Sequence, residues 1–358
     1  MKILHTADLH LGAPMRAHLP PREAKLRRDE LLSTLHRILL LAKKEGCEAI
    51  LIAGDLFDNE AAAAMLAPTV LAEIEKNQEI DFYYAQGNHE GGGRLPAILP
   101  KNLHVFGSSF TFFEKGNVTF CGKSAPKRSD FLNISLQKRR INILVLHGAW
   151  SERDTKSLDI PLGLLKDTGV DYCALGHYHS YSEQRIDSRG VAVYCGCPEG
   201  RGFDEAGQKG VVLIDTAFGH ATHRFIPLPG RILHNLTVDI SAAESLLDVF
   251  SRCEAAVASV KSDDLVRLVL SGSRASLPAP DTEAIERHFR QHFYYIEVED
   301  TSTAAPDFTS IASEHSLRGA FVRAALANET LEQEERMRIL SLGLAALRGN
   351  SKGGAPWN

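Results

Sequence analysis

Five short groups of polar residues in this sequence carry side chains that can bind metal ions, and each group follows a run of apolar residues. The groups are Asp8-Leu9-His10, Gly54-Asp55-Leu56-Phe57-Asp58, Gly87-Asn88-His89-Glu90, His147-Gly148 and Gly176-His177-Tyr178-His179. A mixture of carboxylate, amide and imidazole groups suits Mn²⁺, Fe or Zn²⁺ better than Ca²⁺. The residue types therefore indicate a transition-metal centre.

The spacing within and between the groups supports a shared site. Asp8 and His10 are two residues apart, as are His177 and His179, so each pair shares one face of an extended segment. Side chains at the carboxyl ends of neighbouring strands meet at one edge of a sheet. The glycines that precede Asp55, Asn88 and His177 allow sharp turns and a close approach of the backbone.

The candidate metal ligands are too many for one ion. They are Asp8, His10, Asp55, Asn88, His147, His177 and His179. Such a set fits two ions that share one carboxylate, an arrangement used for phosphoryl displacement. Each group by itself has an ordinary explanation, because Asp-x-His is usually incidental and Gly-Asn-His-Glu is often a turn. The five groups together, each after an apolar run, favour the metal site.

The apolar runs between these groups predict a sheet-based domain. We expect strands at 3–4, 49–53, 82–84, 143–146, 172–175 and 191–194. Near-continuous apolar runs are typical of sheets that are covered on both faces. Leucine and isoleucine at helical spacing predict a helix over 22–45, ended by Gly46, and a second helix over 60–76.

The pattern of apolar runs changes at the proline- and glycine-containing segment Pro227-Leu228-Pro229-Gly230, which we interpret as a domain boundary. Beyond it we expect a strand at 232–240, a helix at 242–260, a strand at 265–270, a helix at 282–292 and a strand at 293–298. The tail is predicted to be helical, with a capping box of Thr330 and Gln333. An apolar stripe there either packs on its own domain or docks a partner; it consists of Met337, Leu340, Leu344 and Leu347.

Composition excludes several classes of protein. The 358 residues are 44% hydrophobic and 24% charged with a net charge of -5, which is unlike a disordered, collagenous or coiled-coil chain and unlike a globally basic nucleic-acid binder. The polar start and the absence of a long apolar run predict a cytoplasmic protein that does not enter a membrane. The spacing of the six cysteines indicates reduced thiols, so we interpret Cys195-Gly196-Cys197 as thiols at a strand end rather than half of a metal site.

The five groups and their order resemble the calcineurin-like metallophosphoesterase superfamily, and within it the SbcD/YhaO-type DNA repair exonuclease family. The finer resemblance lies in five segments: Asp8-Leu9-His10-Leu11-Gly12, Arg27-Arg28-Asp29-Glu30, Gly54-Asp55-Leu56-Phe57-Asp58, Pro198-Glu199-Gly200-Arg201-Gly202-Phe203 and Gly207-Gln208-Lys209-Gly210. Two features depart from it. Glu90 stands where SbcD-type proteins commonly have Asp, and Cys195-Gly196-Cys197-Pro198 stands where related nucleases often have Pro-Gly-Ser-Pro.

This resemblance implies an α/β fold, a four-layer α/β/β/α metallophosphoesterase sandwich over residues 1–230. A small α+β capping domain would follow over 231–300, and a linker with a helical tail over 301–358. The tail is a candidate for docking a partner.

The resemblance also implies roles for the site residues. One ion would be bound by Asp8, His10 and His179, the other by Asn88, His147 and His177, and Asp55 would bridge them. His89 would contact the scissile phosphate and protonate the leaving oxygen, with Glu90 orienting it, although His89 in a purely structural turn is the alternative. Asp58 is a helix N-cap, a loop carboxylate or a site carboxylate. Arg201 and Lys209 would bind substrate phosphate or support the structure near the site.

The implied function is a manganese-dependent DNA exonuclease that acts 3′ to 5′ on duplex ends. It would work as a homodimer, through the helices near 22–46 and 60–76, with an SMC-like ATPase of the SbcC/YhaN type. Two alternatives stay open: a phosphodiesterase or phosphatase for small substrates, and a non-catalytic DNA-end or ATPase scaffold. Basic residues could bind DNA or simply form solvated surface; they are Arg16, Arg22, Lys25, Arg27 and Arg28, and later Lys123, Lys127, Arg128, Lys138, Arg139 and Arg140.

Overall fold

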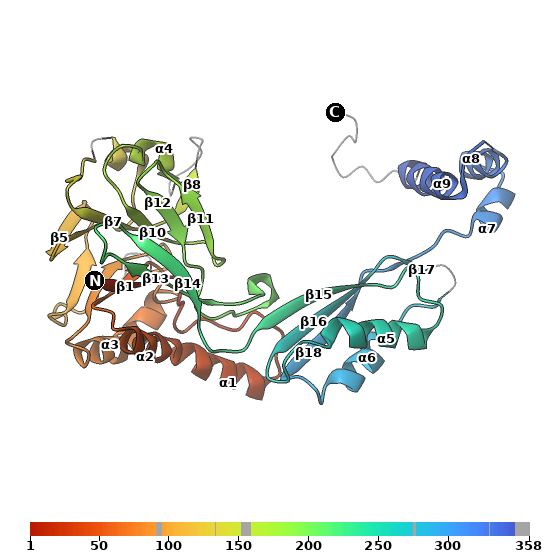
Figure 1. Cartoon of the computed structure of the whole chain (residues 1–358). Helices are drawn as coiled ribbons and strands as arrows, with labels where there is room; N and C mark the ends of the chain where they lie inside the picture. Colours follow the sequence, from red (N-terminus) through yellow and green to blue (C-terminus); the bar gives the residue numbers. More distant parts are fainter. Residues whose placement is uncertain (91–94, 133, 152–158, 275–276, 329, 348–358) are drawn as a thin grey trace. The chain divides into compact units, whose positions relative to one another are not determined.

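The computed structural model describes residues 1–90, 95–132, 134–151, 159–274, 277–328 and 330–347 (Figure 1). The chain forms two compact units. The first comprises Met1–Asn235, Lys261–Arg267 and His292–Tyr295, and the second comprises Leu236–Val260, Leu268–Gln291 and Ile296–Asn358. The domain boundaries near 230 and 300 stay a prediction. Among the described residues, no helix has both the length and the apolar character needed to cross a membrane.

The first unit contains a mixed sheet in the order β14-β13-β1-β2-β3-β4. Its strands are β1 (Lys2–Thr6), β2 (Ala49–Ala53), β3 (Asp81–Ala85), β4 (Leu103–Phe106), β13 (Gly210–Asp215) and β14 (Thr222–Pro227). Strands β1 to β4 are parallel, and β13 pairs antiparallel with β1 and β14. The parallel strands bring their carboxyl ends to one edge of the sheet.

A second sheet faces the first and has the order β11-β12-β10-β7-β6-β5. Its strands are β5 (Thr111–Lys115), β6 (Val118–Gly122), β7 (Ile141–His147), β10 (Tyr172–Gly176), β11 (Ser182–Arg185) and β12 (Val191–Tyr194). The inner strands are parallel, and β5 and β11 pair antiparallel at the two edges. A small parallel pair, β8 (Ala149–Ser151) and β9 (Asp159–Pro161), follows β7.

Helices cover the outer face of the first sheet. They are α1 (Pro21–Leu32), α2 (Thr34–Glu45) and α3 (Glu60–Glu75). The prediction of one continuous helix over 22–45 is wrong, because α1 ends and α2 begins at Ser33. The hydroxyl groups of Ser33 and Thr34 both donate to the carbonyl of Glu30, at 2.7 and 3.2 Å, and so compete with the helical backbone pattern. The predicted end at Gly46 is confirmed by its left-handed φ of 70°.

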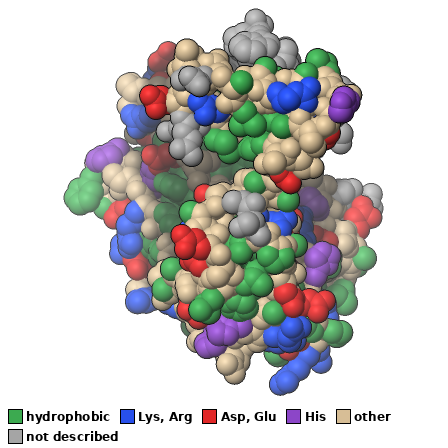
Figure 2. Space-filling model, turned by 90° about the vertical axis from the view of Figure 1, so that its right-hand side faces the viewer, with side chains coloured by type: hydrophobic (Ala, Val, Ile, Leu, Met, Phe, Trp, Pro, Cys, Tyr) green, Lys and Arg blue, Asp and Glu red, His purple; other side chains and the backbone are tan. Residues whose placement is uncertain are grey.

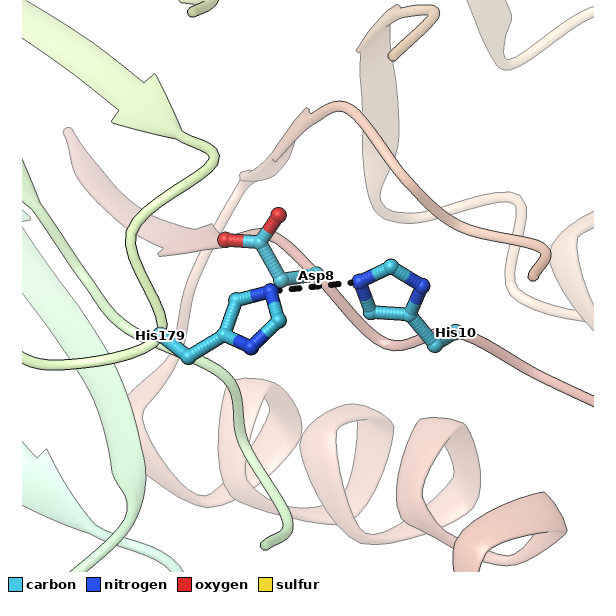
Figure 3. Close-up of side chains that lie close together, drawn as sticks. All are labelled: Asp8, His10 and His179. Atoms are coloured by element: carbon cyan, nitrogen blue, oxygen red, sulfur yellow. Dashed lines mark hydrogen bonds between the residues drawn. The ribbon is translucent and has the colours of Figure 1, made fainter. Parts of the chain in front are cut away.

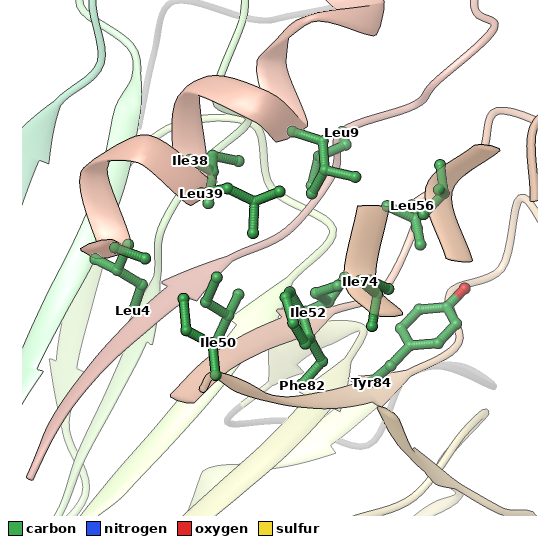
Figure 4. Close-up of a cluster of buried hydrophobic side chains, with 14 of the residues drawn as sticks. Leu4, Leu9, Ile38, Leu39, Ile50, Ile52, Leu56, Ile74, Phe82 and Tyr84 are labelled. Atoms are coloured by element: carbon green, nitrogen blue, oxygen red, sulfur yellow. The ribbon is translucent and has the colours of Figure 1, made fainter. Parts of the chain in front are cut away.

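Three apolar clusters fill the spaces between the layers. One lies between α2, α3 and the first sheet, where Ile38 and Ile74 pack near Ile50 and Phe82 (Figure 4). A second lies between the two sheets. The third covers the outer face of the second sheet, with the short helix α4 (Leu162–Leu165) and the 3₁₀ helix at Arg128–Phe131. This arrangement confirms the predicted four-layer α/β/β/α fold.

The last third of the chain contains a three-stranded sheet in the order β15-β16-β18 and two helices that lie between its strands in the sequence. The elements are β15 (Leu233–Asp239), α5 (Leu246–Val257), β16 (Leu265–Ser271), α6 (Thr282–Phe289) and β18 (Tyr295–Asp300). A two-stranded pair joins β17 (Ser273–Arg274) to β19 (Thr303–Ala304). The predicted α+β module is therefore present, with α5 and α6 shorter than the sequence suggested.

The described part of the tail forms three helices: α7 (Phe308–Ser313), α8 (Leu317–Leu326) and α9 (Gln333–Leu347). Half of the apolar stripe on α9 packs within this group, because Leu340 and Leu344 are buried with residues of α7 and α8. Met337 and Leu347 remain 44% and 41% exposed. The side chain of Gln333 lies outside the described residues, so the predicted capping box stays a prediction.

Candidate metal centre

The predicted ligands lie at the carboxyl ends of five parallel strands. Asp8 and His10 follow β1, Asp55 follows β2 and Asn88 follows β3; in the second sheet, His147 ends β7, and His177 and His179 follow β10. The two sheets face each other, so both sets of strand ends meet at one edge of the sandwich. Figure 3 shows Asp8, His10 and His179 drawn together from the two sheets.

The loops after β1 and β2 are joined to each other by their backbones. The amide of Asp8 donates to the carbonyl of Gly54 at 3.1 Å, and the amide of His10 donates to the carbonyl of Asp55 at 2.9 Å. Four of the predicted ligands adopt positive φ: Asp8 (52°), His10 (43°), Asp55 (48°) and His177 (111°). A left-handed backbone costs a residue with a side chain about 1 kcal/mol or more. Unfavourable backbone of this kind gathers at functional sites, where the surrounding structure imposes it.

Glycines beside the ligands are required by close approach, as predicted. A Cβ atom at Gly54 would lie 2.2 Å from Nδ1 of His147, and one at Gly87 would lie 2.1 Å from Oδ1 of Asp55. At Gly176 it would lie 2.0 Å from the carbonyl oxygen of Ala53, between the two sheets. These three positions therefore exclude any side chain.

The first ligand cluster consists of Asp8, His10 and His179, whose ligand atoms all lie within 4.8 Å of one another. Nε2 of His10 and Nε2 of His179 are 3.3 Å apart (Figure 3). Nδ1 of His179 faces the carboxylate of Glu205 at 2.8 Å. An ionised carboxylate only accepts hydrogen bonds, so Nδ1 of His179 carries the proton and Nε2 offers its lone pair to the cluster.

The Glu205 carboxylate is stabilised in its ionised form. Burial raises its pKa, but hydrogen bonds from His179 and Arg201 outweigh burial and leave the pKa below the usual range of a glutamate. Arg201 donates to Glu205 at 2.7 Å, and both side chains are 2% exposed. A fixed negative charge therefore stands behind His179.

The second ligand cluster consists of Asp8, Asp55 and His147. Nδ1 of His147 donates to the carbonyl of Ala53 at 2.9 Å, so Nε2 is directed at Oδ1 of Asn88, at 2.9 Å, and Oδ2 of Asp55, at 3.3 Å. Burial lowers the pKa of His147, yet its contacts with Asp55 and Asp8 raise it overall to about 9. The two carboxylates therefore stabilise a positive charge at the position of His147.

Asp55 lies between the two clusters. Its Oδ2 atom is 3.7 Å from Nε2 of His10 and 3.3 Å from Nε2 of His147, and its Oδ1 atom accepts the backbone amide of His89 at 3.0 Å. Burial raises its pKa, but contacts led by His147 lower the pKa overall to about 2. Asp55 is thus ionised and faces both groups of imidazoles.

His177 and Asn88 lie at the outer side of the same edge. The backbone amide of His177 donates to both carboxylate oxygens of Asp8 at 3.0 Å. The ring of His177 lies edge-on to the ring of His147, with 5.4 Å between their centroids. The side chain of Asn88 reaches His147 as described.

His89 and Glu90 occupy different environments. Nδ1 of His89 donates to the carbonyl of Asp58 at 3.1 Å, and its exposed ring packs edge-on against His10 with centroids 4.7 Å apart. Glu90 is 1% exposed and accepts the backbone amides of Phe57 at 3.1 Å and Gly87 at 2.9 Å. Glu90 therefore ties the loops after β2 and β3 together.

Asp58 and Asn59 resolve the alternatives left open for the start of α3. Asn59 is the N-cap, because its Oδ1 atom accepts the amide of Ala62 at 2.9 Å. The carboxylate of Asp58 points instead to Nδ1 of His10, at 3.5 Å, and to Arg201, at 3.6 Å. Asp58, His10 and His89 form a further group of potential ligands.

The residues that sequence reasoning missed lie behind the ligands. Glu205, in the 3₁₀ helix Phe203–Glu205, is the partner of His179 and was not singled out. Its spacing of four residues from Arg201 is the signal that could have found it. Lys209, by contrast, was predicted to bind substrate phosphate or support the structure near the site; its ammonium group donates to the backbone carbonyl of His179 at 2.9 Å. The thiol of Cys197 is buried within 3.9 Å of Oε2 of Glu205.

Comparison with known proteins places this site in a family. Residues 1–181 match the family described as calcineurin-like phosphoesterase. The chain is 31% identical over 298 residues to the uncharacterized metallophosphoesterase YhaO of Bacillus subtilis, covering 76% of this chain and 72% of YhaO.

Two further relatives match over shorter regions. The DNA double-strand break repair protein Mre11 of Sulfurisphaera tokodaii is 26% identical over 60% of this chain and 59% of its own length. One component of the nuclease SbcCD of Bacillus subtilis is 32% identical over 30% of this chain and 27% of its own length. The chain belongs to the calcineurin-like phosphoesterase family and is a metal-dependent phosphoesterase.

Proposed function

We propose that this protein is a two-metal phosphodiesterase that acts on DNA as a repair exonuclease. The observation that carries the proposal is the position of Asp55. Its Oδ2 atom faces His10 of one ligand cluster and His147 of the other, at 3.7 and 3.3 Å. A carboxylate in this position suits two cations held side by side, the arrangement that clamps the attacking and leaving oxygens of a phosphoryl displacement.

The nitrogen and oxygen atoms at the site are arranged as ligands for a cation rather than as pairs of hydrogen-bond donors and acceptors. Nε2 of His147 is turned toward two oxygens that accept hydrogen bonds, and Nε2 of His179 is turned toward Nε2 of His10. We assign Asp8, His10 and His179 to one ion and Asn88, His147 and His177 to the other, with Asp55 shared. Two divalent ions, for which we propose Mn²⁺, would supply an activated water and neutralise phosphate charge.

We assign the transfer of a proton to His89. Its Nδ1–H donates to the carbonyl of Asp58, so the imidazolium form of His89 would carry its second proton on Nε2, give that proton to the leaving oxygen of a phosphate at the site and become the neutral ring. Glu90 is a positioning residue in this proposal. It fixes the loop that carries Asn88 and His89 through its bonds to the amides of Phe57 and Gly87.

The names of two relatives support DNA as the substrate, because one is a DNA double-strand break repair protein and the other a component of a nuclease. On this basis we propose 3′ to 5′ action on duplex ends, together with an SMC-like ATPase of the SbcC/YhaN type in the cytoplasm. The partner would bind the tail, where Met337 and Leu347 are exposed. Deletion of the residues after Thr330 should then abolish co-purification of the ATPase but spare cleavage of short DNA.

The proposed DNA contacts need two corrections, because Arg27 and Lys123 are buried. The ammonium group of Lys123 donates to the carbonyl of Ser108 and lies 3.5 Å from the carboxylate of Asp130. Arg27 is 1% exposed, and its guanidinium donates to Glu199 at 2.6 Å, so it is internal and cannot bind DNA. Arg22 and Arg28 of α1 are exposed. On the face shown in Figure 2, basic and acidic side chains are interspersed, which favours a few local phosphate contacts over one broad basic surface.

A homodimer through α1, α2 and α3 also remains a proposal. Much of the apolar surface of α3 cannot contribute to a dimer interface, because Ala67, Val70 and Ile74 are buried against the first sheet of the same chain. Leu40 of α2 and Met65 of α3 are 55% and 69% exposed and are available to a second copy. Light scattering across a dilution series tests this, and a persistent 39.3 kDa species at high concentration would reject it.

One experiment separates the proposal from its alternatives. Full-length protein is incubated with Mn²⁺ and end-labelled duplex DNA, and in parallel with a chromogenic phosphodiester. Stepwise shortening of the DNA supports the exonuclease. Turnover of the small ester alone supports a small-substrate phosphodiesterase, and DNA binding without turnover of either supports a scaffold.

A further inference from the structure

A cavity lies in the first unit of the chain, and one of its lining residues contacts a predicted metal ligand. Its volume is about 270 Å³, and its walls include Glu199, Lys209, Arg231 and Lys261. Lys209 joins it to the metal centre, because its ammonium group donates to the backbone carbonyl of His179 at 2.9 Å. A single side chain, that of Lys209, therefore separates the cavity from the predicted metal ligand His179.

The register of the first sheet places this cavity at the same edge as the ligands. Strand β13 pairs antiparallel with β1, so Gly210, its first residue, lies at the carboxyl end of β1. Gly210 in turn pairs with Pro227, the last residue of β14. Lys209 and the turn at 227–230, which line the cavity, thus lie at the edge that carries Asp8.

The ammonium groups at the cavity carry charge that is not neutralised locally. Within the described ranges of the chain, neither Lys209 nor Lys261 forms an ion pair with a carboxylate. The third cation, Arg231, donates to Glu30 at 2.9 Å and packs over the ring of Tyr294 at 3.8 Å. Arg231 is therefore held in place as part of the wall.

The carboxylate on the cavity wall does not cancel this positive charge, because it is already paired. Oε1 of Glu199 accepts from Arg27 at 2.6 Å, and Oε2 accepts from Arg37 at 2.6 Å. A Cβ atom at Gly230 would lie 2.8 Å from Oε2 of Glu199, so the wall is closely packed there. The walls of the cavity are thus closely packed, and the side chains that line it carry an excess of positive charge.

We propose that this cavity binds a backbone phosphate of the nucleic-acid strand, next to the phosphate that is cleaved. The inference rests on the proposed DNA substrate and adds a second anion site to it. Ammonium groups act as point charges without sequence preference, which suits contact with a strand whose register must advance after each cut. The two lysines would differ in role. Lys209 would bind the phosphate and also donates to the backbone of His179, whereas Lys261 would only bind the phosphate.

The test compares Lys261→Gln with a matched control. Lys101→Gln also removes an exposed lysine, but Lys101 precedes β4 and so lies at the opposite edge of the sheet. Binding of a labelled duplex is measured by fluorescence anisotropy in EDTA, so that cleavage does not interfere. Lys261→Gln should weaken DNA binding about fivefold and reduce the slope of log K against log salt by about one. Lys101→Gln should change neither, and Lys261→Arg should restore both.

Three further measurements decide the interpretation. Turnover of a chromogenic phosphodiester should be unchanged in Lys261→Gln, and an equal loss on this ester and on DNA would overturn the inference. Equal DNA affinity and salt slope for Lys261→Gln and wild type would overturn it as well. Calorimetric binding of deoxyadenosine monophosphate that is lost in Lys261→Gln, with DNA binding unchanged, would show that the occupant is a free nucleotide instead.

These outcomes are distinct from failure of the proposed function. If wild-type protein binds DNA but does not cleave it, the exonuclease proposal fails, while the comparison of Lys261→Gln with wild type still decides whether the cavity holds a strand phosphate.

Discussion

The carboxylate of Glu205 accepts a hydrogen bond from Nδ1 of His179 at 2.8 Å, and Arg201 holds the same carboxylate at 2.7 Å. The three side chains form a hydrogen-bonded chain in which Arg201 and Glu205 are buried, and it ends at the ligand atom of the partly exposed His179. A carboxylate behind a ligating histidine fixes the tautomer and the direction of the ring and increases the basicity of the ligand. The first ligand cluster therefore depends on a residue that was not among its predicted ligands.

Replacing Glu205 tests this hydrogen-bonded chain. Glu205→Gln should weaken Mn²⁺ binding about 10- to 100-fold, because the amide no longer fixes the proton on Nδ1 of His179. Calorimetric titration of the metal-free protein measures the loss. The control is Asp204→Asn, since Asp204 is a neighbouring carboxylate whose side chain is 58% exposed. Equal metal affinities for the two variants would show that Glu205 only packs.

Replacing Asp55 tests the two-metal arrangement. Asp55→Asn removes the charge that faces both clusters, so the variant should bind fewer ions and lose turnover. The number of metals per chain at saturating Mn²⁺ is measured by elemental analysis, beside hydrolysis of a chromogenic phosphodiester. The hypothesis fails if wild-type protein is fully active with fewer than two ions per chain.

Replacing His89 separates chemistry from metal binding. His89→Ala should retain both metals and DNA affinity but cleave about 10² times more slowly, the effect expected for a lost general acid. Metal content and DNA binding are measured on the same preparation. Loss of metal in this variant would make His89 a ligand, as its position near His10 and Asp58 also permits.

Replacing Gly176 tests the contact between the sheets. A Cβ atom there would lie 2.0 Å from the carbonyl oxygen of Ala53, so Gly176→Ala should separate the strand ends and destabilise the fold by about 1–3 kcal/mol. Thermal unfolding measures the loss. The control is Gly163→Ala in α4, where an added Cβ meets nothing within 4 Å. Similar melting temperatures for both variants would contradict the close contact.

The cysteines should be unreactive in the folded protein. All six are buried, and burial raises the pKa of Cys47 to about 11 and that of Cys121 to about 12. A raised pKa leaves little thiolate at pH 8, and thiolate is the reactive form. Iodoacetamide should therefore modify the native chain far more slowly than the denatured chain, as mass spectrometry would show. Rapid labelling of native Cys197 would indicate an accessible thiol beside Glu205.

The sequence by itself indicated β1, β2, β3, β7, β10 and β12 and the order of the ligands, whereas the four-layer fold was what the family resemblance implied. Each ligand follows an apolar run directly, and each supporting glycine is its neighbour in the chain, so short-range patterns were sufficient. The apolar runs also fixed the covered sheets, since a strand without polar positions must be buried on both faces. Gly46 ended its helix as predicted for the same local reason.

Only the tertiary structure decided which side chains stand behind those ligands. Glu205 is 26 residues from His179, and Glu199 is 172 residues from Arg27. No local period links such residues, because their pairing depends on how the sheets and loops pack. The structure also shows that Arg27, a candidate DNA contact in the sequence, forms a buried ion pair with Glu199. A buried arginine requires a partner to offset its lost hydration, and only the folded chain identifies that partner.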